Sequence, residues 1–283
     1  MQTILRSKSK SAVIDNEAPF VVIGEKINPT GRKKLAAALQ EGNLAYVKEL
    51  AEKQIAAGAD LLDVNVGVPG LDDVAMLPKV VELLVSEFDI PLCIDTANAS
   101  ALAAALPLAP GKVLVNSVNG EEASLRTVLP LVKEYNAAVI GLTMDDNGIP
   151  ATPEQRLAIA GKILDRAAQH GIAPEDVVID PLVLTVGADS QASRITLGTI
   201  EMVKREFGVN INIGASNVSF GLPDRDTINT AFLALAILAG ASCAITDPMK
   251  YIYAIRAVDL LLGRDDYAGR YIKYFRGHPK EQA

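Results

Sequence analysis

Short apolar runs alternate along the chain with longer segments whose apolar residues recur at helical spacing. The runs are rich in β-branched residues and lie at 20–24, 61–66, 92–94, 113–115, 138–143, 177–179, 210–213 and 243–246. Between them, segments such as 44–55 and 157–167 place their apolar residues on one face of a helix. The pattern predicts eight strands, each followed by a helix.

The strands read as nearly continuous apolar runs, as expected for a parallel sheet that is covered on both faces. A glycine precedes several of them and fits a helix C-terminal cap: Gly58, Gly171, Gly208 and Gly240. The strict alternation favours a closed (β/α)8 TIM barrel over an open doubly wound sheet. The glycine-rich phosphate turns that mark many open sheets are missing from the sequence.

No linker divides the chain, so we expect a single domain. Residues 1–18 are predicted to form an N-terminal arm rather than a strand. The barrel is predicted over residues 19–264. Residues 265–283 form a charged, aromatic C-terminal tail that would finish a helix or cover the barrel.

Composition argues against several classes of protein. The 283 residues are 49% hydrophobic and carry a net charge of −7, which argues against nucleic-acid binding. The longest apolar stretch, 231–239, is too short to cross a bilayer, and no secretory signal is visible, so a cytoplasmic protein is expected. Cys93 and Cys243 lie inside predicted strands, and two cysteines cannot make a disulfide framework or a cysteine-rich zinc site.

Acidic and amide side chains follow most of the predicted strands. Because the C-terminal ends of barrel strands converge, we expect them to form one binding surface. A lone Asp there more often caps a helix, but so many acceptors in equivalent places indicate a site. The set comprises Glu25, Asn28, Asp63, Asn65, Asp95, Asn116, Asp145, Asp180, Ser216, Asn217 and Asp247.

Such a ring suits either a hard cation such as Mg²⁺ or a flat heterocycle that offers several N–H donors. Phosphates are disfavoured, because lysine and arginine are nearly absent from the strand ends. The only cations close to them in the sequence are Lys26, Arg32 and Arg225. These three could meet the carboxylate tail of a ligand. His170 and His278 do not follow strands, which argues against histidine acid–base chemistry. The chemistry would then rest on positioning, on hydrogen bonds or on an external cofactor.

Seven motifs follow one another along the chain: 24–31 (GEKINPTG), 63–67 (DVNVG), 94–96 (IDT), 115–117 (VNS), 141–144 (GLTM), 179–182 (IDPL) and 216–223 (SNVSFGLP). In this order they resemble the motifs of the pterin-binding barrels and especially of the methyltetrahydrofolate:corrinoid protein methyltransferases. That family includes the folate module of cobalamin-dependent methionine synthase, and the resemblance spans residues 20–263.

The resemblance implies a role for each matching residue. Asp95, Asn116 and Asp180 would hold the pyrimidine edge of the pterin, and Asn217 would reach N5, the atom that carries the methyl group, as the catalytic residue. Further substrate contacts are implied for Gly214, Ser216, Asp63, Asn65 and Arg225. Asp145 and Asp247 receive no role.

The implied reaction moves a methyl group between N5 of tetrahydrofolate and the cobalt of a corrinoid, in a direction that the sequence does not set. The Asp-x-His-x-x-Gly motif of cobalamin modules is absent from the sequence, so cobalamin would arrive on a separate corrinoid protein. No metal is expected to be bound by this chain. The family resemblance also implies a homodimer.

Three alternatives remain open. A dihydropteroate synthase would use the same barrel, but in that family a cationic loop after strand seven helps to bind a diphosphate, and residues 216–220 contain no cation. A Mg²⁺-dependent lyase or aldolase would use Asp63, Asp95, Asp180 and Asp247. A folate-binding subunit would bind tetrahydrofolate without catalysis.

Overall fold

The computed structural model describes residues 1–278 and contains a parallel barrel of eight strands. In barrel order these are β8 (Val177–Asp180), β7 (Ala138–Leu142), β6 (Leu114–Asn119), β5 (Leu92–Asp95), β4 (Leu61–Val64), β3 (Val21–Ile27), β10 (Cys243–Thr246) and β9 (Asn212–Gly214). The seam between β8 and β9 is closed by a parallel bridge from Ile179 to Ile211. The predicted (β/α)8 barrel is confirmed, although β3 and β6 extend further toward their C-terminal ends than their apolar runs suggested.

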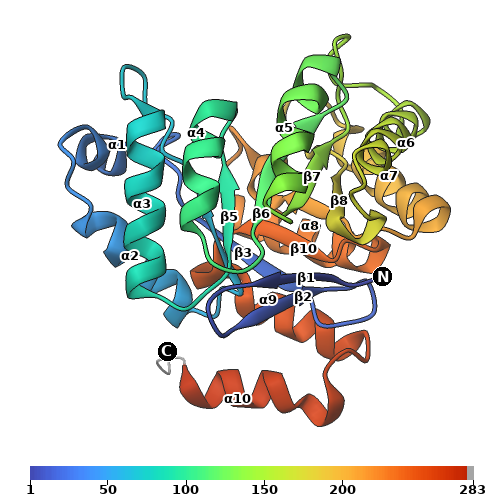
Figure 1. The fold of residues 1–283 in the computed structure, drawn as a ribbon. Helices are drawn as coiled ribbons and strands as arrows, with labels where there is room; N and C mark the ends of the chain where they lie inside the picture. Colours follow the sequence, from blue (N-terminus) through green and yellow to red (C-terminus); the bar gives the residue numbers. More distant parts are fainter. Residues whose placement is uncertain (279–283) are drawn as a thin grey trace.

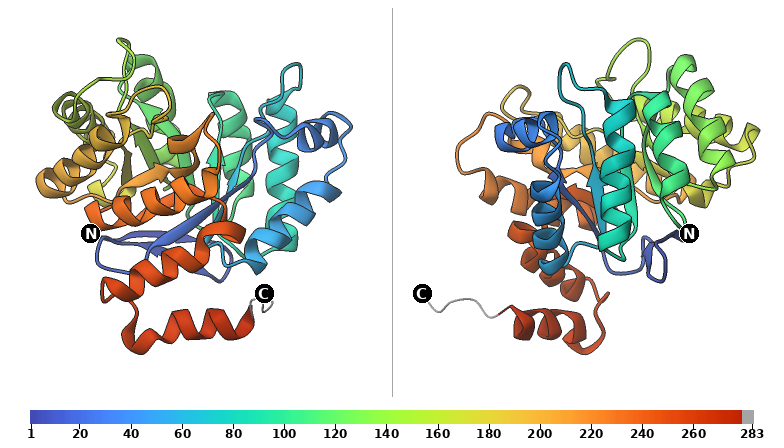
Figure 2. Two further views of the ribbon diagram at one scale, coloured as in Figure 1. Left: turned by 180° about the vertical axis from the view of Figure 1, so that it is seen from behind. Right: turned by 60° about the vertical axis from the view of Figure 1, so that its left-hand side comes forward.

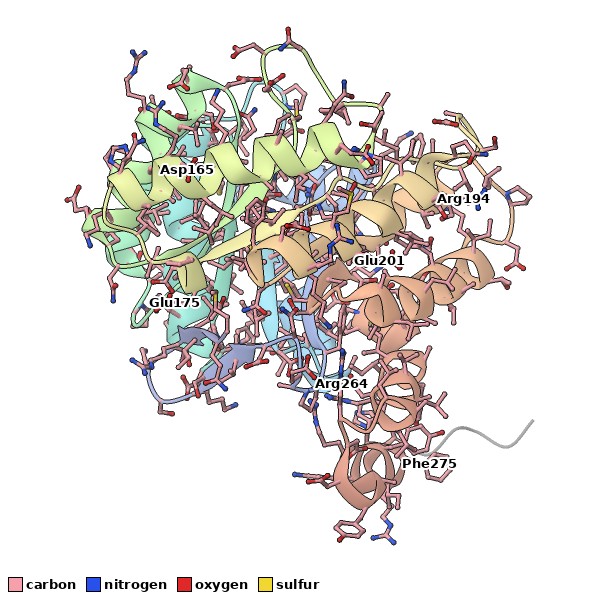
Figure 3. All side chains as sticks on the ribbon, turned by 90° about the vertical axis from the view of Figure 1, so that its right-hand side faces the viewer. Asp165, Glu175, Arg194, Glu201, Arg264 and Phe275 are labelled. Atoms are coloured by element: carbon pink, nitrogen blue, oxygen red, sulfur yellow. The ribbon has the colours of Figure 1, made fainter. Side chains whose placement is uncertain are left out.

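Helices form a ring around this barrel (Figure 1). They are α1 (Lys33–Gln40), α2 (Ala45–Ala56), α3 (Asp73–Glu87), α4 (Ala99–Ala105), α5 (Glu122–Glu134), α6 (Pro153–Gln169), α7 (Ala192–Phe207), α8 (Arg225–Ala239) and α9 (Pro248–Leu261). Charged side chains such as Asp165 on α6 and Glu201 on α7 cover the outside of the ring (Figure 3). The predicted cap at Gly208 is confirmed, because that residue ends α7 in the left-handed conformation, with φ of 64°. The short helix α1 was not predicted.

Two apolar layers fill the molecule. The larger one lies between the strands and the helices, and the smaller one fills the inside of the barrel with residues such as Leu61, Cys93 and Val178. Side chains alternate along a strand, so the residue two positions further on points to the same interior. Those positions hold Asp63, Asp95 and Asp180. The polar ring is therefore the continuation of the barrel core toward the C-terminal ends of the strands.

The N-terminal segment is a β-hairpin, so the prediction of an arm without strands was wrong. Strands β1 (Thr3–Arg6) and β2 (Ser11–Ile14) pair antiparallel, and Leu5 and Ile14 are fully buried in the interior cluster. The apolar alternation over four residues is too short to stand out beside the charged turn between the strands. The hairpin lies across the N-terminal ends of the barrel strands (Figure 1).

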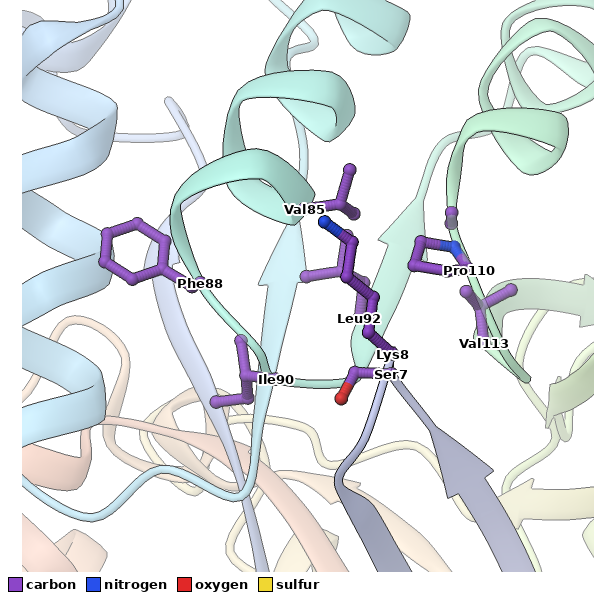
Figure 4. Close-up of a pocket in the computed structure, with 9 residues that line it drawn as sticks. Ser7, Lys8, Val85, Phe88, Ile90, Leu92, Pro110 and Val113 are labelled. Carbon is purple, nitrogen blue, oxygen red and sulfur yellow. The ribbon is translucent and has the colours of Figure 1, made fainter.

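The turn of the hairpin packs against the segments that lead into β5 and β6. In Figure 4, Ser7 and Lys8 lie between Ile90 on one side and Pro110 on the other. The gap enclosed there measures about 10 Å³, which is room for about one water molecule. Leu5 and Ile14 of the hairpin are fully buried in the interior cluster, so a ligand would reach the barrel interior from the opposite, C-terminal end.

The tail forms a short 3-10 turn (Asp266–Ala268) and one more helix, α10 (Gly269–Gly277), beneath the barrel beside α9 (Figures 1 and 2). Asp265 accepts the backbone N–H groups of Arg270 and Tyr271, and the Tyr274 hydroxyl donates to the Ala57 carbonyl at the end of α2. The tail thus lies far from the C-terminal face. Its last residues, 279–283, lie outside the described residues. Among residues 1–278 no helix has the length and apolar character needed to cross a membrane.

Candidate active site

A cavity of about 660 Å³ opens at the C-terminal end of the barrel. Ten of the predicted site residues line it together: Glu25, Asn28, Asp63, Asp95, Asn116, Asp180, Gly214, Ser216, Asn217 and Arg225. The apolar side chains of Leu142, Val183 and Ile245 form part of the cavity wall. A neighbouring hollow of about 430 Å³ shares Asp95, Asn116 and Leu142 with it and extends over the start of α5.

Asp63 and Asp95 form one polar group with their amide neighbours. The Asn116 side-chain N–H donates to Asp63 Oδ1 at 3.2 Å, and the Asn65 side-chain N–H donates to Asp95 Oδ2 at 3.0 Å. Asn65 does not itself line the cavity, so its role is to orient the Asp95 carboxylate through this hydrogen bond. Burial raises the pKa of both carboxyl groups, and for Asp63 the nearby Asp95 raises it further.

Asp180 sits on the opposite side of the cavity and accepts two hydrogen bonds. The Leu182 backbone N–H donates to Oδ1 at 2.8 Å and the Asn212 side chain donates to Oδ2 at 2.7 Å. Asp180 is 7% exposed, and this burial raises the pKa of its carboxyl group to about 6, against the lowering effect of those two donors. A carboxylate held in this way keeps lone pairs directed at the cavity.

Asn212 is a site residue that the sequence interpretation missed. It is fully buried in β9, which was read only as an apolar run. Asn210, Asn212 and Gly214 alternate with isoleucines, and this period of two was the available signal that one face of the strand is polar.

Asn217 lies on a tight turn, the 3-10 helix Ala215–Ser219, that follows β9. Its side-chain nitrogen passes so close to Gly214 that a Cβ there would meet it at 3.1 Å, which explains why a glycine precedes the turn. Within residues 1–278 the Asn217 amide has no hydrogen-bond partner. It is therefore free to bind a ligand in the cavity.

Glu25 was placed at a strand end but received no role in the implied site. In the structure it lines the cavity from β3, and its Oε2 accepts the Ser216 hydroxyl at 2.8 Å. Arg32 approaches the other carboxylate oxygen at 3.4 Å. Ser216, predicted as a substrate contact, thus has its hydroxyl engaged by the protein.

Besides Asn65, two members of the predicted ring do not line the cavity. Asp145 accepts the Asn147 backbone N–H at 2.9 Å within a turn and lines a separate hollow. Asp247 caps α9 by accepting the Met249 backbone N–H at 3.1 Å and pairs with Lys26. Both therefore have the helix- or turn-capping role that is common for Asp after a strand.

Acceptors on opposite walls, a free amide and apolar surface between them fit a flat heterocycle with N–H donors. Among residues 1–278, no group of three or more His, Cys, Asp and Glu side chains is arranged to hold a metal ion. Lys26 is paired, and the cations at the rim, Arg32 and Arg225, also contact protein groups.

A family model described as pterin binding enzyme matches residues 24–247. The chain is 31% identical over 265 residues to a methylcorrinoid:tetrahydrofolate methyltransferase of Eubacterium limosum, which covers 91% of this chain and 96% of that relative. It is also 31% identical over 249 residues to methionine synthase of Mycobacterium tuberculosis, a match that covers 83% of this chain but 21% of the longer protein.

Among solved structures, a Yersinia pestis dihydropteroate synthase with a pterine–sulfa conjugate is similar in fold. The TM-score is 0.70 at 16% identity, with 92% of this chain and 99% of that chain covered. Identity this low supports the fold and no more.

Proposed function

The chain belongs to the family of pterin-binding enzymes, and on that premise we propose that it transfers a methyl group between N5 of tetrahydrofolate and a corrinoid carried by a separate protein. The observation that carries the proposal is the unpaired Asn217 amide above a cavity whose walls hold Asp95, Asn116 and Asp180. The match along almost the whole length of the Eubacterium limosum methyltransferase supports it.

The acceptors account for binding. A tetrahydropterin offers an exocyclic NH₂ and a ring N–H side by side, and one carboxylate can accept both. The Asp95 and Asp180 carboxylates can accept such donors, and the Asn116 carboxamide can both donate and accept a hydrogen bond. A ligand that lacked these donors would leave buried acceptors unpaired, so the cavity would discriminate strongly against it.

Asn217 accounts for the acceleration of methyl transfer. The corrinoid supplies the cobalt centre that exchanges the methyl group. When the N5–methyl bond breaks, N5 keeps the bonding electron pair and takes up a proton from solvent to give tetrahydrofolate. A fixed amide donor stabilises the negative charge that develops on N5 as the bond breaks. In the reverse direction the side-chain oxygen of Asn217 can accept the N5–H, so that the N5 lone pair stays free to take the methyl group and the proton is then released to solvent.

Stopped-flow spectroscopy tests the proposal. Reduced cobalamin is mixed with 5-methyltetrahydrofolate, and methylated cobalamin is mixed with tetrahydrofolate, each with and without the protein. We expect the protein to accelerate the change in the cobalt absorption spectrum in at least one direction. Binding of folate without any change in that rate would assign the chain to folate binding alone.

Dihydropteroate synthase activity is the second candidate, because the solved structures of similar fold carry it. Incubation with pterin diphosphate and p-aminobenzoate should yield no pteroate, since the turn at 215–219 offers no cation to a diphosphate. A Mg²⁺-dependent lyase is distinguished by EDTA, which should leave methyl transfer unchanged. The homodimer and the separate corrinoid protein stay predictions.

A further inference from the structure

The turn that carries Asn217 is tied to two neighbouring elements. On one side, the Ser216 hydroxyl donates to Glu25 on β3. On the other, the Arg225 guanidinium at the start of α8 donates through Nη2 to the Ser216 carbonyl at 2.6 Å and through Nε to the Ser219 hydroxyl at 3.0 Å. The planar guanidinium therefore joins the second residue of the turn to its last residue.

A buried chain of hydrogen bonds holds this contact in place. The Ser219 hydroxyl donates to Asn229 Oδ1 at 2.6 Å, the Asn229 amide donates to the Tyr251 hydroxyl at 2.9 Å, and that hydroxyl donates to Asp226 at 2.8 Å. Ser219 is fully buried, and Asn229 and Tyr251 are 2% and 3% exposed. Polar groups at this depth must satisfy one another, so the turn, α8 and α9 are locked together.

We propose, on the basis of the function proposed above, that Arg225 is a positioning residue that holds the 215–219 turn so that the Asn217 amide stays over the cavity. Asn229 fixes Arg225 in turn through Ser219. The alternative role for Arg225 is to bind the carboxylate tail of folate. Binding the tail does not explain why the Nε and Nη2 donors of Arg225 are both directed at the 215–219 turn. It also does not explain why the Ser219 hydroxyl that Arg225 contacts is held by a buried chain of hydrogen bonds.

The proposal predicts a separation of rate from affinity. The Asn217 side chain has no bond of its own within residues 1–278, so its direction depends on its turn. A displacement of about 1 Å from the reacting atom can lower a rate by about 100-fold. The residues expected to hold the pterin edge lie on β5, β6 and β8, and loosening the turn leaves them in place.

The experiment compares wild type, Arg225→Ala and Arg225→Lys in single-turnover methyl transfer, with two substrates. One is 5-methyltetrahydrofolate and the other is a 5-methyltetrahydropterin without the p-aminobenzoylglutamate tail. For Arg225→Ala we expect the saturating rate to fall about 10- to 100-fold with both substrates and the dissociation constant to change less than about threefold. Arg225→Lys should restore little, because one ammonium group cannot copy the guanidinium fork.

Two controls separate positioning from general disruption. Arg194→Ala removes an exposed arginine from the first turn of α7 (Figure 3) and should leave the rate unchanged. On an Asn217→Ala background, Arg225→Ala should lower the rate by less than about threefold, because a residue that acts through Asn217 has nothing left to position.

The outcomes are distinguishable. A loss confined to the tailed substrate and expressed in its dissociation constant would show that Arg225 binds the tail, and additive losses in the double variant would also overturn the proposal. Full activity of Arg225→Ala would refute the positioning role alone. A wild-type protein without methyl transfer would refute the proposed function itself.

Discussion

The Asn212 side chain donates a 2.7 Å hydrogen bond to Asp180 across the seam where β9 meets β8. This bond opposes the effect of burial and lowers the pKa of the Asp180 carboxyl group. Because the carboxylate form is the one that can accept N–H groups from a pterin, Asn212 adjusts the affinity of the cavity without touching the ligand.

Replacing Asn212 by Ala should therefore weaken folate binding. The Asp180 pKa rises further without its donor, so the carboxylate form is scarcer near neutral pH. We expect the dissociation constant to rise about tenfold at pH 6.5 and less at pH 8.5, where the carboxyl group is ionised again. Fluorescence or calorimetric titration at both pH values measures this.

Cys243→Ala is the matched control for this variant. The Cys243 thiol contacts Asn212 Oδ1 at 3.7 Å from the adjacent strand, and among residues 1–278 it makes no hydrogen bond to Asp180. Its removal disturbs packing around Asn212 and leaves the donor in place, so affinity should hardly change. If both variants lose affinity equally, packing rather than the hydrogen bond is responsible.

Folate affinity of the wild type should depend on pH through Asp180 itself. Its pKa of about 6 is raised above the ordinary value, so the carboxylate needed for binding forms as the pH rises through that region. Affinity should increase from pH 5 to 7 by about tenfold and then level off. In Asp180→Asn the affinity should be lower throughout and the inflection near pH 6 should disappear. An unchanged inflection in that variant would assign the titration to another group, such as Asp63 or Asp95.

The sequence was sufficient for the barrel because each strand carried its own apolar run and each was followed by a helical period. It also placed most of the cavity correctly, because the rule that strand ends converge applies whatever the loops do. It could not separate the acids that face the cavity from those that cap a helix. Asp180 and Asp247 both follow a strand, and one turns inward while the other caps α9.

The N-terminal hairpin and the hydrogen-bond network that supports the Asn217 turn could not be predicted from the sequence, for a different reason. Both depend on pairs of residues that are distant in the chain, such as Asn210 with Thr3, or Asn229 with Tyr251. Local periodicity contains no information on such pairs. Asn212 is the exception, since the alternating polar residues of β9 were visible.

Asn210 should be important for stability rather than activity. It is 1% exposed, and its amide donates to Thr3 Oγ1 at 2.9 Å and to the Ile14 carbonyl at 2.8 Å, which fastens the hairpin to the barrel. Asn210→Ala leaves these buried acceptors unpaired, so we expect the free energy of unfolding to fall by about 2 kcal/mol. Urea denaturation measures it, with the exposed Ser11→Ala as a control within about 0.5 kcal/mol of wild type. Equal stability of Asn210→Ala would show that apolar burial alone holds the hairpin.

Asn217→Ala gives the most direct test of the catalytic assignment. If the free amide stabilises charge that develops on N5, its loss should lower the single-turnover rate at saturating folate and corrinoid by about 100-fold. The dissociation constant for folate should change by less than about threefold, because the acceptors that hold the pterin edge lie on other strands. Asn147→Ala, which removes an exposed amide outside the cavity, should match the wild type in both measurements. A loss in affinity as large as the loss in rate would mean that Asn217 binds the ground state and the transition state equally, and that some other group supplies the acceleration.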